Sequence, residues 1–197
     1  MSLQHNRDVR PECGPHPHPS DPTAWVRRFA PLIAAGGTVL DLACGYGRHA
    51  RFLEDSGRRV VAVDRDAQAL AGLAGRTGIR ALQADIESGD WPCGAQRFAG
   101  IVVANYLHRP LFARLVDALD EGGVLIYETF MWGNERFGRP SNPAFLLRPD
   151  ELLEVFGKQL RVVAFEQGEV AQPKPAVVQR LCAVKGGGPA RPLPPAK

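Results

Sequence analysis

Two glycines, Gly45 and Gly47, follow a short apolar run and precede a helical pattern, an arrangement that can hold a ligand. Glycine has no Cβ, so the backbone can turn sharply and lie against a bound molecule. The turn leads into a helix predicted over 47–56, and the first N–H groups of a helix attract anionic or polar ligand atoms. The spacing therefore predicts a site for a nucleotide-like cofactor.

Acidic residues follow the next two apolar runs and could bind the other parts of such a cofactor. Asp64 ends the run 59–64, and a carboxylate at that place in an open α/β sheet commonly accepts hydrogen bonds from a ribose. Asp85 and Ile86 follow the run 79–84, where a carboxylate can bind the exocyclic amine of adenine and an apolar side chain can cover its ring. Three successive strand ends thus carry polar chemistry.

The elements that must position these residues alternate between strand and helix, which predicts a doubly wound, mostly parallel α/β sheet with helices on both faces. The last two strands have no helix between them, only Gly168 and a proline loop, and are expected to form an antiparallel hairpin at the sheet edge. We expect strands at 38–43, 59–64, 79–84, 98–104, 122–128, 161–166 and 177–184, and helices at 23–33, 47–56, 66–75, 111–119 and 149–157.

Length and composition predict one globular domain. The chain has 197 residues, of which 45% are hydrophobic, and we expect a single domain over 20–185, with disordered segments at 1–19 and 186–197. A net charge of +3 without a basic stripe does not favour DNA or RNA as a partner. No apolar run is long enough to span a bilayer, so no membrane partner is expected.

Cysteine and histidine usage favours free thiols and no metal. The four cysteines are scattered, and no secretory signal is present, which predicts a reducing, cytoplasmic environment. Cys13, His16 and His18 lack a clear fourth ligand, so no metal site is expected. Cys44, inside the glycine turn, is interpreted as a small packing residue rather than a nucleophile.

These motifs together resemble those of class I S-adenosylmethionine (SAM)-dependent methyltransferases. The segment 41–47, Asp-Leu-Ala-Cys-Gly-Tyr-Gly, is similar to the family's first motif, and 84–86 to its adenine motif. The segment 121–126 is similar to the Pro-Gly-Gly turn before strand five, with Glu121 in the Pro position. The resemblance implies a Rossmann-like seven-stranded sheet of order 3-2-1-4-5-7-6 with the last strand antiparallel. It also implies SAM as cofactor and S-adenosylhomocysteine (SAH) as product.

Within this resemblance Asp41 would position the glycine turn and reach toward the amino group of the methionine part of SAM. Arg48 could pair with the carboxylate of SAM or point to solvent. The predicted cofactor-binding residues are Asp41, Ala43, Gly45, Gly47, Arg48, Asp64, Asp85, Ile86 and Asn105.

The segment after strand four supplies the candidate catalytic residues, His108 and Tyr106. His108 could act as a general base or be an ordinary hydrogen-bonded loop residue. Methyl transfer is an in-line displacement that positioning can catalyse without a dedicated base. The N-terminal helix and the long segment after strand five could cover an acceptor, or that segment could be a packed structural loop. The acceptor-binding candidates are Trp25, Glu128, Phe130, Arg136 and Asn142.

The sequence therefore predicts a SAM-dependent methyltransferase with a small-molecule or inorganic acceptor, as a monomer or homodimer. Its motifs are similar to those of small bacterial tellurite-resistance and thiopurine-type methyltransferases. Three alternatives stay open at this point. The acceptor could be protein or RNA, the chain could be a non-catalytic SAM-binding regulator, or it could be an NAD-dependent oxidoreductase. The last arises because Gly45, Gly47 and Ala50 also fit the looser dinucleotide fingerprint.

Overall fold

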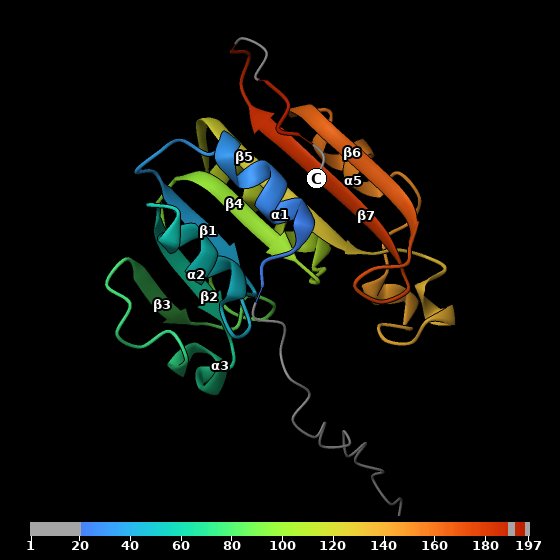
Figure 1. The fold of residues 1–197 in the computed structure, drawn as a ribbon, viewed down its shortest axis with the longest axis horizontal. Coiled ribbons are helices and arrows are strands. Elements are labelled where there is room, and N and C mark those ends of the chain that lie inside the picture. Colours follow the sequence, from blue (N-terminus) through green and yellow to red (C-terminus); the bar gives the residue numbers. More distant parts are fainter. Residues whose placement is uncertain (1–20, 189–191, 196–197) are drawn as a thin grey trace, which may run out of the picture.

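The computed structural model describes residues 21–188 and 192–195. Its seven strands form one sheet of order β3-β2-β1-β4-β5-β7-β6 (Figure 1), so the predicted fold class is confirmed. The first five strands are parallel, and β7 is antiparallel to both β5 and β6. The strands are β1 (Thr38–Leu42), β2 (Arg59–Asp64), β3 (Ile79–Gln83), β4 (Phe98–Ala104), β5 (Leu119–Phe130), β6 (Leu160–Val170) and β7 (Ala176–Lys185).

Helices cover both faces of the sheet. In Figure 1, α1 and α2 lie in front of the sheet and α5 lies behind it. The α-helices are α1 (Ala24–Phe29), α2 (Arg48–Asp55), α3 (Ala67–Ala71), α4 (Phe112–Ala118) and α5 (Glu151–Phe156), and the 3-10 turns are η1 (Ala30–Leu32), η2 (Arg109–Leu111), η3 (Asn134–Arg136) and η4 (Pro143–Phe145).

Alternation along the strands creates two apolar cores. In β1, Leu40 and Leu42 belong to the core beneath α4 and α5, whereas Val39 belongs to the core beneath α1, α2 and α3. The same alternation in β5 sends Tyr127 to the first core and Ile126 to the second. Because successive side chains of a strand point to opposite faces, a doubly covered sheet needs apolar residues at both parities.

The hairpin of β6 and β7 is longer than its predicted strands. Their ladder runs from Leu160 opposite Lys185 to Val170 opposite Ala176, so the connection is only 171–175. Gly168, which was predicted to lie in the connection, lies inside β6 opposite Val178. The antiparallel partner satisfies the backbone groups of the extra residues, which local sequence could not indicate.

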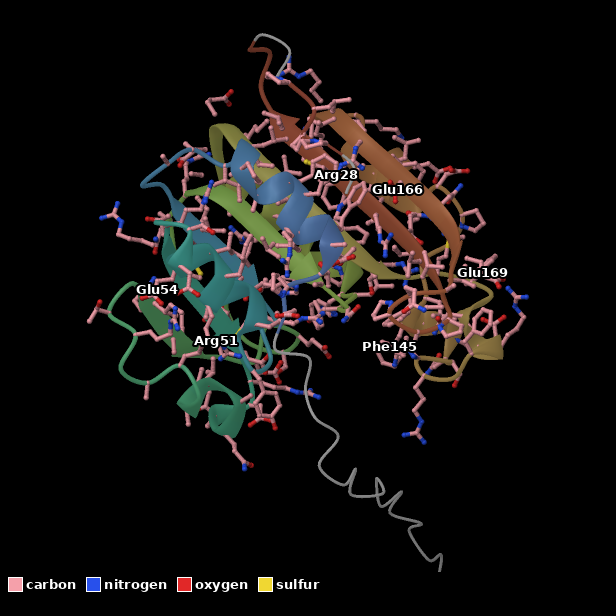
Figure 2. The ribbon with its side chains drawn as sticks, viewed as in Figure 1. Arg28, Arg51, Glu54, Phe145, Glu166 and Glu169 are labelled. Atoms are coloured by element: carbon pink, nitrogen blue, oxygen red, sulfur yellow. The ribbon has the colours of Figure 1, made fainter. Side chains whose placement is uncertain are left out.

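The predicted terminal segments are only partly within the described residues. The segment 1–19, with the unlikely metal ligands Cys13, His16 and His18, lies outside them. Residues 186–188 and 192–195 contain no helix or strand, and Arg28 Nε donates to the Pro194 carbonyl at 3.3 Å. Arg28 also lies beside Glu166 of β6 (Figure 2), at 3.6 Å.

Within 21–188 and 192–195, no cluster of three His, Cys, Asp or Glu side chains is placed to hold a metal ion. No helix of those ranges is long and apolar enough to cross a membrane. The described cysteines, Cys44, Cys93 and Cys182, are buried.

Candidate cofactor and acceptor site

A pocket of about 390 Å³ opens where the parallel strands end, the edge at which open α/β sheets bind ligands. Every strand from β1 to β5 contributes to it, together with the segment between β5 and α5. Its lining residues are Ala43, Asp64, Arg65, Ala84, Asp85, Ile86, Glu87, Asn105, Tyr106, Leu107, Thr129, Phe130, Pro140 and Phe145.

The glycine turn seats the N-terminus of α2 beside this pocket. Ala43 and Gly45 both have a φ of 53°, and Gly47 has a φ of 72°. A Cβ on Gly47 would lie 2.4 Å from Cδ2 of Leu73, so both backbone conformation and packing require glycine there. A positive φ at Ala43 is unfavourable for a residue with a Cβ, and such strain is concentrated at functional sites. The Cys44 N–H donates to the Val63 carbonyl at 3.0 Å, which ties the turn to β2.

Two of the predicted carboxylates line the pocket and shape its edge. Asp64 accepts from Gly45 N–H at 2.7 Å and from Asp66 N–H at 3.0 Å, so it joins the end of β2 to the glycine turn. Asp85 accepts from Glu87 N–H at 2.9 Å and from Ser88 Oγ at 2.8 Å. These hydrogen bonds hold the pKa of Asp85 below its ordinary value, so it is an anion at neutral pH.

Asp41 lies behind the lining, at the base of the glycine turn. Its side chain is 1% exposed, and its Oδ2 has no hydrogen-bond partner among the described residues. Burial raises its pKa from 3.8 to about 7, opposed by a hydrogen bond from the Ala50 backbone and by the charge of Arg48. A buried carboxylate oxygen without a partner is costly, and an ammonium group would satisfy it. The residues present therefore fit the methionine end of SAM.

Glu128 lies on the α1 side of β5, in a buried polar cluster rather than among the residues that line the pocket. Its Oε2 is 3.3 Å from Arg180 Nε, and the Thr23 hydroxyl and the charge of Arg48 act on it too. Burial raises the pKa of Glu128 despite these partners. The next residue, Thr129, lines the pocket instead. The two differ because successive residues of a strand face opposite sides.

The structure places Trp25 and His108 outside the pocket lining. Trp25 is a core residue, 3% exposed, whose Nε1 donates to the Leu181 carbonyl at 3.3 Å. His108 is half-buried, and its carbonyl accepts from Leu111 N–H at the start of η2. Neither side chain is among those that line the pocket formed by the described residues.

Arg136 and Asn142 also lie outside the lining. Arg136 is at the surface, where its Nη2 is 3.0 Å from Glu169 of β6, a residue labelled in Figure 2. Asn142 caps η4 by accepting from the Ala144 N–H at 2.9 Å. Of the acceptor candidates, Phe130 alone is brought to the pocket described here.

Tyr106, a predicted catalytic residue, does line the pocket. Its hydroxyl donates to Glu87 Oε1 at 3.3 Å, and its carbonyl accepts from the buried Tyr127 hydroxyl at 3.0 Å. Burial and the neighbouring Glu87 raise the pKa of Tyr106, so its phenol stays protonated at neutral pH. Tyr106 can therefore donate a hydrogen bond but is poorly suited to remove a proton.

The segment 131–147 contributes Pro140 and Phe145 to the pocket lining, and tertiary contacts hold the segment in place. Leu147 N–H donates to the Phe130 carbonyl at 3.0 Å, which fixes its base. Arg109 donates to Ala144 and Leu146 carbonyls, each at 2.9 Å, and is paired with the buried Glu151. These contacts place Phe145 at the pocket, on the side of the molecule where Figure 2 labels it.

Sequence reasoning did not single out several lining residues, and local signals differ among them. Glu87 follows the adenine motif directly, so its proximity could have been inferred. Predicting that Thr129 lines the pocket would have needed the observed end of β5. Predicting the same for Pro140 and Phe145 would have needed the tertiary contacts of the segment 131–147. The lining residues that were not among the predicted site residues are Arg65, Ala84, Glu87, Leu107, Thr129, Pro140 and Phe145.

The strand order and the pocket at the carboxyl ends of the parallel strands are those of a Rossmann-like fold, the class of fold in which many enzymes bind a nucleoside cofactor. Residues 39–123 match a family model described as a methyltransferase domain. With this match and the sheet order, the chain carries a methyltransferase domain with the fold of class I SAM-dependent methyltransferases, and it is structurally similar to TehB-like methyltransferases. The predicted methyltransferase family, with SAM as its cofactor, is borne out by this match and this fold.

Solved structures with this fold include TehB from Haemophilus influenzae, with a TM-score of 0.68 and 20% identity over 82% of this chain. The chain spans only 61% of the length of that TehB. A TehB-like SAM-dependent methyltransferase from Corynebacterium glutamicum has a TM-score of 0.62 and 20% identity, over 84% of this chain and 89% of that one. The glycopeptide N-methyltransferase MtfA, solved with SAH, has a TM-score of 0.61 and 22% identity, over 84% of this chain and 90% of that one. No curated protein sequence matches the chain.

Proposed function

We propose that the enzyme transfers the methyl group of SAM to a small-molecule acceptor held in the same pocket as the cofactor. One observation carries the proposal. The pocket of about 390 Å³ is lined by the strand-end carboxylates and Ile86 and also by the aromatic side chains of Tyr106, Phe130 and Phe145. A cofactor and a small second substrate can therefore meet within one cavity.

For the cofactor we propose the following roles. Asp64 holds the ribose hydroxyls, and Asp85 with Ile86 binds the adenine. The unpartnered oxygen of Asp41 receives the ammonium of the methionine part, and Arg48 lies where it can pair with the carboxylate. Burial lowers the pKa of Arg48, and the negative charges of Glu128 and Asp41 act in the opposite direction. The Arg48 side chain therefore lies near these two carboxylates rather than in open solvent.

Bound SAM supplies a methyl group on a positively charged sulfur, which an acceptor lone pair can attack. The chain's own contribution is to orient the acceptor. Phe130, Pro140 and Phe145 give the pocket an apolar surface for it, and positioning of this kind can supply much of the rate enhancement. Because the Tyr106 phenol stays protonated, we assign it the role of a hydrogen-bond donor and not that of a general base.

Isothermal titration of the protein with SAM, SAH and NAD tests the cofactor site. We expect SAM and SAH to bind and NAD not to bind. Asp64→Ala should weaken SAM binding by about tenfold or more, the scale of lost hydrogen bonds to a charged group. Asp120→Ala, an exposed carboxylate at the start of β5, is the matched control. Unchanged affinity in a folded Asp64→Ala variant would remove Asp64 from the site.

The acceptor proposal has its own readout. SAH formation is measured with SAM and fractionated small-molecule extract, and separately with protein and RNA fractions. Turnover with the small-molecule fraction is the expected result. Turnover confined to protein or RNA would contradict a small acceptor while leaving the cofactor assignments intact.

A further inference from the structure

The acceptor side of the pocket has a definite chemical character. We call its six lining residues the acceptor wall. Phe130, Pro140 and Phe145 have apolar rings, Leu107 is aliphatic, and Tyr106 and Thr129 carry hydroxyl groups. None of the six side chains is a cation. The acceptor wall consists of Tyr106, Leu107, Thr129, Phe130, Pro140 and Phe145.

The charged groups of the pocket are mostly negative. Asp64, Asp85 and Glu87 line it, against a single guanidinium, that of Arg65. Arg109 contacts the segment that carries Phe145, but its donors are taken by the buried Glu151 and by the Ala144 and Leu146 carbonyls. Binding of an oxyanion normally depends on bidentate guanidinium or other cationic donors. The acceptor wall provides no such donor.

Glu87 differs from the other two carboxylates. Both oxygens of Asp64 accept backbone N–H groups, and both oxygens of Asp85 accept donors from its own loop. The Glu87 side chain accepts only from the Tyr106 hydroxyl within the described chain. It therefore has acceptor capacity left at the point where the loop after β3 meets the acceptor wall. A ligand with an N–H, O–H or S–H donor would use that capacity.

We propose that the methyl acceptor is an organic nucleophile with a flat apolar body and a neutral or cationic polar end, held by the acceptor wall and recognised by Glu87. A protonated amine would lose its proton to solvent before its lone pair attacks the methyl group, and the electron pair of the broken C–S bond stays on the sulfur of SAH. Oxyanions, inorganic or organic, are excluded as acceptors. This inference rests on the proposed function of the pocket and narrows the substrate class for it. Glu87 is a specificity-determining residue in this arrangement, and Tyr106 orients its carboxylate.

Binding of four matched probes to the SAH-saturated protein tests the proposal. The probes are benzylamine, which is cationic, benzyl alcohol, which is neutral, benzoate, and tellurite. We expect benzylamine and benzyl alcohol to bind at millimolar concentration and the two anions not to bind. Glu87→Gln should weaken benzylamine by about threefold to fivefold, the scale of an exposed ion pair, and leave benzyl alcohol unchanged. Asp90→Asn, an exposed carboxylate on the same loop outside the lining, is the control.

Three results would overturn the inference. The first is binding of benzoate or tellurite as tight as that of benzylamine, and the second is no binding of either benzylamine or benzyl alcohol. The third is a Glu87→Gln variant with lower affinity for SAH and unchanged affinity for benzylamine. The last would assign Glu87 to the cofactor. Failure of the proposed function has a separate readout, which is that the wild-type protein does not bind SAH. In that case the four probes are titrated into the protein without SAH, and the same criteria apply.

Discussion

Replacing Asp41 by Asn is expected to stabilise the cofactor-free protein at neutral pH while weakening cofactor binding. The Asp41 side chain is 1% exposed and has an oxygen without a partner in the described structure. Burial raises its pKa from 3.8 to about 7. The folded protein thus holds this proton more tightly than the unfolded chain does. Stability from Asp41 is therefore lost as the pH rises between these two pKa values.

The magnitude follows from the same two values. One pKa unit corresponds to about 1.4 kcal/mol, so the rise from 3.8 to about 7 sets a ceiling of about 4 kcal/mol on the cost of ionising Asp41 in the fold. Relaxation of the surroundings lowers this cost, because the effective dielectric constant in proteins is about 20. We expect Asp41→Asn to raise the free energy of unfolding by about 2 kcal/mol at about pH 8, and by less than about 1 kcal/mol at about pH 5.

Urea unfolding at both pH values, followed by circular dichroism, measures the effect. Taking the difference between variant and wild type removes the titration of other groups that both proteins share. Asp117→Asn, which changes an exposed carboxylate on α4, serves as the control. Titration with SAM should show weaker binding to Asp41→Asn. Equal destabilisation of Asp41→Asn at both pH values would refute the reasoning, because it would mean that the carboxylate makes a favourable contact in the free protein.

Three further changes have expected outcomes. Gly47→Ala should lower the free energy of unfolding by about 3 kcal/mol, and Gly45→Ala, with a similar φ but open space at its Cβ, by about 1 kcal/mol; equal urea midpoints would contradict this. Arg109→Ala leaves its buried carboxylate partner short of a cation and should cost about 2 kcal/mol. It should also speed proteolysis within 131–147, and an unchanged cleavage rate would argue against anchoring. Burial lowers the pKa of His49 from 6.5 to about 3. The folded protein holds this imidazole neutral, so protonation of His49 in the unfolded chain lowers the free energy of unfolding as the pH falls from 6.5 toward 3. His49→Gln should therefore flatten the acid limb of a stability–pH profile, and an identical limb would show that another group controls it.

The part of the pocket formed by the strand ends was predictable because its residues follow local signals. Asp64, Asp85 and Ile86 each come at or just after the end of an apolar run, and parallel strands bring such ends to one edge. Gly45 and Gly47 were found through the backbone they permit, which depends only on the residue itself. No knowledge of distant contacts was needed for these assignments.

The acceptor side depended on contacts between distant segments. A strand predicted over 122–128 makes Glu128 its last residue, free to face the ligand. In the structure β5 continues, because Thr129 pairs with Gln179 and Phe130 with Val178 of β7. This pairing keeps Glu128 within the strand, where alternation directs it to the α1 side, and brings Thr129 to the pocket. A pairing register set by β7, fifty residues away in the sequence, thus decides which side chain of β5 lines the pocket. If the pocket holds the acceptor as proposed, changing where β5 stops pairing should change acceptor specificity while leaving the proposed cofactor residues unaltered.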